Sequence, residues 1–113
     1  MTTRRAVLAL LPMAGLAIAC GAGAPPVPER KPETHTVTID ATSYAPKSLV
    51  VHAGDTIVWD NKDVIAHTAT AEGTFDSQTI LSGASWRYTV SKKGVIDYAC
   101  LFHPTMTAKL EVQ

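Results

Sequence analysis

Short runs in which apolar and polar residues alternate fill the chain from His35 onward, and they constrain its fold more than any other feature. This period of two is typical of strands with one buried face, and helical periodicity is absent. Turn-forming sequences separate the runs. We therefore expect an all-β chain, a Greek-key β-sandwich of about seven to eight strands whose loops gather at its two ends. The residues expected to face inward are Val37, Ile39, Leu49, Val51, Ile57, Trp59, Trp86, Tyr88, Val90, Ile96, Tyr98 and Cys100, and the expected turns are Ala53-Gly54-Asp55, residues 60–63, Glu72-Gly73, Ser82-Gly83 and Lys92-Lys93-Gly94.

Length and charge narrow the possible functions. The 113 residues suffice for one ordinary domain, and a hydrophobic content of 46% gives that domain a core. Ten basic residues balance ten acidic ones, and no stretch concentrates Lys and Arg on one face. Nucleic acid is therefore not an expected partner.

The first residues have the composition of an export signal. Arg4 and Arg5 precede an apolar run from Ala6 to Ala19 that only Pro12 and Gly15 interrupt. The run is shorter than the roughly 20 apolar residues that cross a bilayer, so we do not expect a transmembrane helix. A buried N-terminal helix is the alternative to an export signal and is not the favoured interpretation. The arginine pair resembles a twin-arginine signal. We expect residues 1–19 to direct export to the periplasm or cell envelope.

The residues after this run indicate a spacer. Leu16-Ala17-Ile18-Ala19-Cys20 resembles a bacterial lipoprotein box, which favours a lipid on Cys20, with cleavage by ordinary signal peptidase as the alternative. Four prolines between Gly21 and Pro32 predict an extended segment. We expect a spacer at 20–34, possible attachment to the membrane through Cys20, and a single domain at 35–113.

The two cysteines of the chain are not expected to form a disulfide. An exported protein with two cysteines normally suggests one bridge, here between Cys20 and Cys100. A lipidated Cys20 has no free thiol, and Cys100 has other potential metal ligands close to it in sequence. Both cysteines therefore have a different expected role.

The segment from Tyr98 to Leu110 carries the chemistry. Cys100, His103 and Met106 supply a thiol, an imidazole and a thioether at three-residue intervals. Thiolate and thioether favour Cu(I) and imidazole also serves Cu(II), so two His, one Cys and a distant Met suit copper that changes between the two states. Pro104 discourages a helix here. His67, just after the expected strand that contains Trp59, is the candidate for the second imidazole, giving the ligand set His67, Cys100, His103 and Met106.

At these residues the sequence resembles the cupredoxin family, especially its small plastocyanin-, pseudoazurin- and amicyanin-like members. The resemblance spans about residues 35–112 and is strongest in the Cys-x2-His-Pro-x-Met motif, whose short Cys-to-His spacing is most similar to amicyanin. Other matching segments are Tyr44-Ala45-Pro46, residues 49–51 and 54–59, Asn61-Lys62-Asp63 before His67-Thr68, and Phe75-Asp76-Ser77 followed by Leu81 and Gly83.

The resemblance implies a cupredoxin-like sandwich that binds one copper ion, Cu(I) or Cu(II), and carries single electrons. It implies transient partners such as c-type cytochromes or dehydrogenases, a monomer, and an electron route through His103 in an apolar patch with Leu101, Pro104 and Ala66. It also implies that Asn61 forms a hydrogen bond across the two ligand loops and holds Cys100 against His67.

Two positions differ from the family pattern. Thr68 stands where Asn often follows the first His, and Ala108 stands where Gly often follows two places after Met. We expect Thr68 to offer its hydroxyl to the other ligand loop and Ala108 to avoid the left-handed region.

Two other functions would use copper ligands, and several other residues could bind a metal or pack the sheets. A lipid-anchored copper carrier or scavenger that delivers the ion to another envelope protein would use the same ligands. A copper oxidase or reductase is not expected, because such an enzyme needs a second copper centre and a substrate pocket in a larger chain, so the protein is expected not to be an enzyme. His35 and His52 lack comparable neighbours in sequence and are expected to be solvated, and Trp59, Trp86 and Tyr88 are expected to pack the sheets.

Overall fold

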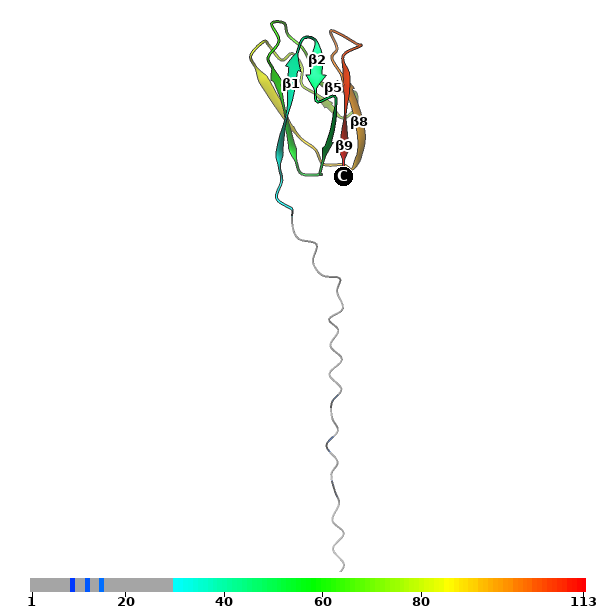
Figure 1. The fold of residues 1–113 in the computed structure, drawn as a ribbon. Helices are drawn as coiled ribbons and strands as arrows, with labels where there is room; N and C mark the ends of the chain where they lie inside the picture. Colours follow the sequence, from blue (N-terminus) through cyan, green and yellow to red (C-terminus); the bar gives the residue numbers. More distant parts are fainter. Residues whose placement is uncertain (1–8, 10–11, 13–14, 16–29) are drawn as a thin grey trace, which may run out of the picture.

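A computed structural model of the chain describes residues 30–113 and, ahead of them, only positions 9, 12 and 15 (Figure 1). Most of the signal, Cys20 and most of the spacer expected from the sequence therefore lie outside the described residues. The described part contains nine strands: β1 (Thr34–Asp40), β2 (Ser43–Ala45), β3 (Ser48–Val51), β4 (Thr56–Asn61), β5 (Thr70–Ala71), β6 (Phe75–Asp76), β7 (Ser85–Thr89), β8 (Gly94–Ala99) and β9 (Thr107–Val112).

The strands form two sheets that face each other (Figure 1). One has the order β2-β1-β4-β7 and the other the order β3-β9-β8-β5-β6. Most neighbours are antiparallel, but β1 pairs parallel with β4 and β3 pairs parallel with β9. The expected all-β sandwich is confirmed. The count exceeds the expected seven to eight because β5 and β6 have only 2 residues each, too few to show any alternation in the sequence.

The core lies between the sheets, at the positions that the alternation predicted. Val37, Ile39, Ile57 and Trp59 have no exposed surface, and they belong to the adjacent strands β1 and β4. Aromatic rings fill the space opposite them. Trp59 contacts Tyr98 of the other sheet edge-on, with ring centroids 5.5 Å apart. The expected packing role of Trp86 and Tyr88 is also confirmed, because both lie half-buried against this core.

The parallel pairing of β1 and β4 separates the two ends of the sandwich. Thr34 lies opposite Thr56 at one end and Ile39 lies opposite Asn61 at the other. We call the first the far end. The second is the ligand end, because the loops 62–69 and 100–106 both start from it, as the pairing of Thr70 with Ala99 shows.

Asp55 organises the far end. Its carboxylate has no exposed surface and accepts hydrogen bonds from the Arg30 guanidinium (2.9 Å) and the backbone N–H of Glu33 (2.9 Å), and it contacts Nε2 of His35 (2.9 Å). The backbone N–H of His52 donates to the same carboxylate. The expectation that His35 is a solvated residue without a partner was wrong, because the register of β1 against β4 brings it to a buried acid that lies 20 residues away in sequence.

Residues 30–113 contain no α-helix. The described residues accordingly include no helical segment of the length and apolar character that a membrane crossing requires.

Candidate metal centre

Two loops of the ligand end bring the predicted side chains together. His67 lies in the loop between β4 and β5, where its backbone pairs with Ile80 through two hydrogen bonds, of 3.1 and 2.8 Å. Cys100 directly follows β8, and His103 lies in the short turn before β9. Each side chain is therefore placed by the end of a strand or by a backbone pair, which limits how far the three can move apart.

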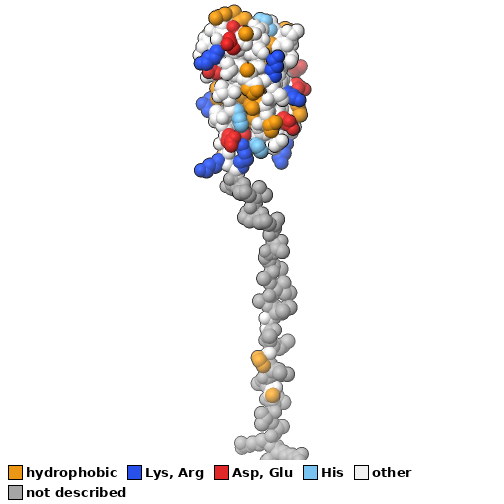
Figure 2. All heavy atoms as spheres, in the orientation of Figure 1, with side chains coloured by type: hydrophobic (Ala, Val, Ile, Leu, Met, Phe, Trp, Pro, Cys, Tyr) orange, Lys and Arg blue, Asp and Glu red, His pale blue; other side chains and the backbone are white. Residues whose placement is uncertain are grey.

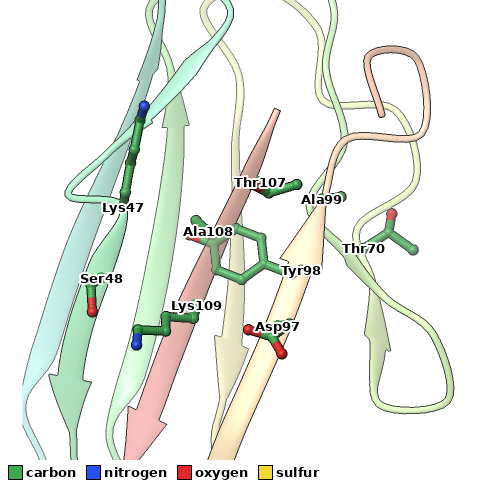
Figure 3. A pocket seen from close by; sticks show the side chains of 9 residues that line it. All are labelled: Lys47, Ser48, Thr70, Asp97, Tyr98, Ala99, Thr107, Ala108 and Lys109. Atoms are coloured by element: carbon green, nitrogen blue, oxygen red, sulfur yellow. The ribbon is translucent and has the colours of Figure 1, made fainter. Parts of the chain in front are cut away.

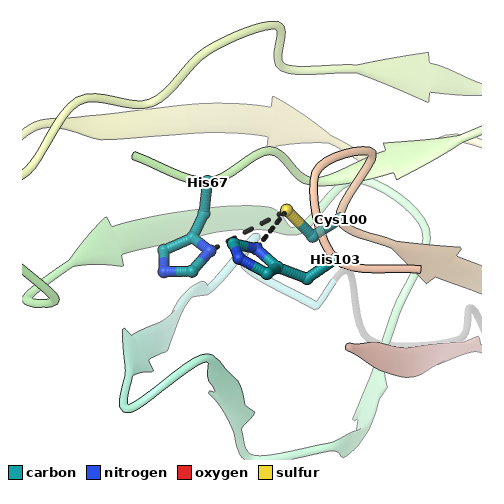
Figure 4. A group of neighbouring side chains, drawn as sticks. All are labelled: His67, Cys100 and His103. Atoms are coloured by element: carbon teal, nitrogen blue, oxygen red, sulfur yellow. Dashed lines mark hydrogen bonds between the residues drawn. The ribbon is translucent and has the colours of Figure 1, made fainter. Parts of the chain in front are cut away.

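The donor atoms of His67, Cys100 and His103 all lie within 4.8 Å of one another. In Figure 4 both imidazole rings turn toward the sulfur, and the Nδ1 atom of each ring is 3.8 Å from Sγ of Cys100. The ring centroids are 5.1 Å apart. His67 and Cys100 are buried, whereas His103 is half-exposed.

These separations fit ligands that share one ion. Metal–ligand bonds of about 2.0–2.3 Å at trigonal angles place two ligand atoms about 3.7 Å apart. The observed 3.8 Å from sulfur to each Nδ1 agrees with that geometry and is long for a direct hydrogen bond. Two imidazoles and a thiol around one point are the donors that copper prefers.

Met106 completes the predicted set at the end of the same loop. The backbone N–H of Cys100 donates to the carbonyl of Met106 (3.0 Å), and the N–H of Met106 donates to the carbonyl of His103 (2.8 Å). These two bonds close the loop tightly and bring the backbone of Met106 next to the backbones of Cys100 and His103. The Met106 side chain is buried, 4% exposed, directly before β9.

The surroundings of Cys100 favour a thiolate. Burial on its own raises the pKa of this thiol, but the hydrogen bond from the backbone N–H of Thr68 foremost, and then the contacts with the imidazoles of His103 and His67, lower the pKa to about 6. The Thr68 nitrogen lies 3.3 Å from Sγ. A thiolate is the form that binds a metal, so the site is prepared for an ion before one arrives.

Asp63 orients the buried imidazole. Nε2 of His67 is 2.8 Å from Oδ2 of Asp63, on the side of the ring away from Nδ1. A carboxylate accepts only, so Nε2 carries the hydrogen and Nδ1 keeps a free lone pair that faces the sulfur. The backbone N–H of Thr42 and the contact with His67 lower the pKa of Asp63, which keeps the carboxylate ionised. No role was expected for Asp63 from the sequence, where it stands only in a turn and in a segment that matches the family.

Thr68 connects the two ligand loops. Its Oγ1 accepts a hydrogen bond from the backbone N–H of Leu101 (2.9 Å), and its own N–H donates to Cys100. The expected contact of the Thr68 hydroxyl with the other loop is confirmed, and Ala108 stays outside the left-handed region as expected.

The expectation for Asn61 was wrong. Its amide donates to the carbonyls of Ile65 (2.9 Å) and Ile80 (3.0 Å) and accepts from the N–H of Asp63 (3.0 Å), so it braces the loop that carries His67 from within. No hydrogen bond of Asn61 reaches residues 100–106 within the described part of the chain. Thr68 lies between the two loops and makes the contact that Asn61 was expected to make.

One further cluster of potential ligands and one hollow occur among the described residues, and neither is part of this centre. Glu33, His35 and Asp55 bring donor atoms within 4.8 Å, but Arg30 contacts both carboxylates, at 3.2 and 2.9 Å, so this group is an ion-pair cluster. A hollow of about 660 Å³ lies over the outer face of β3, β9 and β8, and Figure 3 shows its lining of Lys47, Lys109, Asp97 and their neighbours. None of the four predicted ligands lines this hollow.

Comparison with known proteins identifies the family. The sequence profile of the Cupredoxin-like domain matches residues 9–112. The chain belongs to the cupredoxin family. In a cupredoxin, the cluster of His67, Cys100 and His103 together with Met106 fits one copper ion per chain.

Individual cupredoxins agree with this placement. Amicyanin from Paracoccus versutus is 26% identical over 83 residues, which are 68% of this chain and 63% of that relative, so the chain spans under two thirds of its length. The crystal structure of Paracoccus versutus amicyanin is 27% identical, with a TM-score of 0.65 over 71% of this chain and 81% of that one. A proline-to-glycine variant of amicyanin in its reduced Cu(I) form at pH 4 has 26% identity and a TM-score of 0.66, covering 71% and 82% of the two chains.

Proposed function

We propose that this cupredoxin carries single electrons between redox partners through a type 1 copper centre held by His67, Cys100, His103 and Met106. The observation that carries the proposal is the convergence of two imidazole Nδ1 atoms on one thiol sulfur, each 3.8 Å away. Copper supplies a one-electron couple when bound to such a donor set. No substrate chemistry is proposed.

The protein contributes a rigid donor set. His67 is held by Asp63, Cys100 by the N–H of Thr68, and the loop from Cys100 to Met106 by its own backbone hydrogen bonds. Residues held from several directions have little freedom to rearrange when the charge of a bound ion changes. A small rearrangement favours rapid electron transfer, because less free energy is needed to reorganise the site.

Burial supports electron transfer over delivery of the ion. His67 is 0% and Cys100 1% exposed, so a partner protein has no direct access to two of the donors. A copper carrier that hands over its ion needs ligands that an acceptor can reach and replace. Comparing the rate of copper loss to a chelator with the rate of redox cycling distinguishes the two functions.

The route for the electron is proposed to be His103. This imidazole is half-exposed at the ligand end, and exposed apolar side chains surround the two loops. Figure 2 shows such side chains gathered at the end opposite to the grey segment. We define the apolar rim as Val64, Ile65, Leu81, Leu101 and Phe102, whose exposed fractions run from 44% to 88%.

The apolar rim suits brief contacts with other redox proteins. Transient redox complexes bury less than about 1,200 Å² and dissociate quickly. We propose c-type cytochromes or dehydrogenases as the class of partner, with the protein acting as a monomer. The proposed location is the periplasm or cell envelope, on the grounds of the export signal at 1–19 and the possible lipid on Cys20, and the mass of the mature N-terminus tests both.

The function is tested with copper-loaded protein by visible absorption and electron spin resonance. Oxidised wild type is expected to show an intense thiolate-to-copper charge-transfer band that disappears on reduction and returns on oxidation. A Cys100→Ser variant should lack the band. A colourless copper complex of the wild type, or equal spectra for the two proteins, would contradict the proposal.

A further inference from the structure

A chain of side-chain hydrogen bonds leads from the ligand loop to the protein surface. The backbone N–H of Leu101 donates to Oγ1 of Thr68 (2.9 Å), Oγ1 of Thr68 lies 3.0 Å from Oγ1 of Thr70, and the Thr70 hydroxyl donates to Oδ1 of Asp76 (3.2 Å). Thr68 is 2% exposed, Thr70 is half-buried and Asp76 is exposed. None of the three side chains belongs to the proposed ligands.

The direction of this chain follows from the number of hydrogens. A carboxylate only accepts, so the single hydrogen of the Thr70 hydroxyl is used on Asp76. Oγ1 of Thr70 must then accept, and the Thr68 hydroxyl must donate to it. The Thr68 oxygen is thereby turned toward Leu101 as an acceptor. Every bond of the chain points from the ligand loop to the carboxylate.

Other contacts hold the two ends of the chain in place. The Asp76 carboxylate also accepts from the backbone N–H of Gln78 (2.8 Å), which fixes it on the turn after β6. The Tyr44 hydroxyl donates to the carbonyl of Thr68 (2.5 Å). Thr68 therefore uses its N–H, its hydroxyl and its carbonyl at once, and its N–H is the donor to Cys100.

We propose that Thr70 and Asp76 are positioning residues of the metal centre: their hydrogen bonds fix the Thr68 hydroxyl, and Thr68 fixes the loop that carries Cys100. The inference rests on the proposed function, since it concerns how that centre is tuned. Negative charge near the centre stabilises Cu(II) relative to Cu(I). Because the chain ends in a carboxylate and is polarised toward it, interrupting the chain should favour the reduced ion.

The decisive variant is Thr70→Val, which keeps every charge and nearly the same shape but removes the hydroxyl. At a fixed ambient potential, the ratio of Cu(I) to Cu(II) in this variant is expected to rise about threefold. This is the size of effect expected when the hydrogen bond between Thr68 and Thr70 is lost. Thr70→Ser restores the hydroxyl and should return the ratio to the wild-type value. Thr74→Val, at an exposed threonine in the turn between β5 and β6, is the matched control and should leave the ratio unchanged.

A second pair of variants separates the hydrogen-bond chain from simple charge. Asp76→Ala and Glu72→Ala each remove one exposed carboxylate from the same β5–β6 hairpin, but only Asp76 receives the Thr70 hydroxyl. Asp76→Ala is expected to shift the ratio in the same direction as Thr70→Val, and Glu72→Ala is expected to shift it much less.

The copper-free protein gives an independent measurement. Hydrogen exchange of the Leu101 amide should quicken about threefold in Thr70→Val and stay at the wild-type rate in Thr70→Ser. Equal ratios and equal Leu101 exchange in Thr70→Val and wild type would overturn the inference, as would equal shifts in Asp76→Ala and Glu72→Ala. If wild type itself failed to bind copper, the proposed function would be contradicted. If wild type had the expected spectrum but the variants had the wild-type Cu(I)/Cu(II) ratio and Leu101 exchange rate, only the positioning role would be overturned.

Discussion

Asp63 and His67 lie four residues apart and join Oδ2 to Nε2 at 2.8 Å, although the loop that contains them is not helical. The contact turns the free lone pair of Nδ1 toward Cys100, on the other side of the ring. A buried imidazole would otherwise have two tautomers available, and only one of them can bind a metal through Nδ1.

This contact predicts the effect of Asp63→Asn on copper affinity. The amide no longer requires a hydrogen on Nε2 and carries no charge, so the affinity for Cu(II) should fall by about tenfold, as for other groups that orient metal ligands. A competition titration with a chelator measures the affinity. Asp60→Asn is the control, since Asp60 pairs with Lys62 at 3.2 Å and not with a proposed ligand. Equal affinities of the two variants would contradict the role given to Asp63.

The lowered pKa of Cys100 predicts how the stability of the copper-free protein changes with pH. The folded thiol has a pKa of about 6 against an ordinary 9.0, so between these values the unfolded chain binds more protons than the folded one. The thiolate therefore contributes stability that is fully present above the ordinary pKa and is lost as pH falls through about 6. The free energy of unfolding of wild type minus that of Cys100→Ser should increase as pH rises through this window. Denaturant titrations at several pH values measure it, and a difference independent of pH would count against a thiolate.

The apolar rim predicts the effect of added charge on electron transfer. Val64→Lys places a cation at a residue that is 88% exposed beside the ligand loops, and transfer to a c-type cytochrome should slow about tenfold because the charge must be desolvated on contact. Val95→Lys is the matched control, since Val95 is 60% exposed but pairs with Glu111 near the far end. Stopped-flow kinetics of both variants, with their reduction potentials checked, provide the measurement. Similar slowing by both would mean that the partner does not use the ligand end.

The same surface predicts a weak dependence of wild-type electron transfer on salt. The side chains that form the apolar rim are uncharged, and the exposed Lys62 of the same loop is paired with Asp60 at 3.2 Å, so raising ionic strength should remove little attraction between the partners. We expect the second-order rate constant to change by less than about tenfold between low and physiological ionic strength. A steep decline would point to a charged docking surface elsewhere.

Asp55 predicts a stability effect that spares the metal centre. Asp55→Asn weakens the contacts with Arg30 and His35, and the melting temperature should fall by about 4–8 °C, with the visible spectrum of the copper protein unchanged. Burial raises the pKa of Asp55, but its contacts with Arg30, Glu33, His35 and His52 bring it well below the ordinary 3.8, so its ionised form stabilises the fold above that pH. The gap between wild type and variant should therefore narrow as pH falls below 3.8. Glu111→Gln, at an exposed acid of β9 outside this ion-pair cluster, serves as the control in thermal unfolding.

The core positions and most of the ligands could be predicted, because they depend on residues that are close together in the sequence. The alternation of apolar and polar residues within each strand shows which of its faces is buried. It therefore predicted the core positions Val37, Ile39, Ile57 and Trp59 correctly. The ligands in residues 100–106 were evident because their spacing within one short loop already brings them together. His67 followed from the missing second imidazole and from its position just after the expected strand that contains Trp59, because a lone histidine has no pattern of its own.

The contacts that were missed join residues whose closeness depends on strand register. From the sequence, Asp55 is predicted to be an ordinary turn residue after Gly54. Only the pairing of β1 with β4 brings His35 to it. Thr70 and Asp76 belong to strands of 2 residues, which leave no periodic signal. Asn61 was expected to connect the two ligand loops because the resemblance transferred to it a role that Thr68 has here.

The anchoring of Arg30 to Asp55 has a consequence for anything joined to the chain upstream. The guanidinium holds the incoming backbone at the far end, and the 6 residues of β4 separate it from the loop that carries His67. A strand of that length spans roughly 16 Å. The described chain thus enters the domain at Arg30, on the end of the sandwich opposite to the half-exposed His103, so the imidazole and the point of entry do not compete for the same surface.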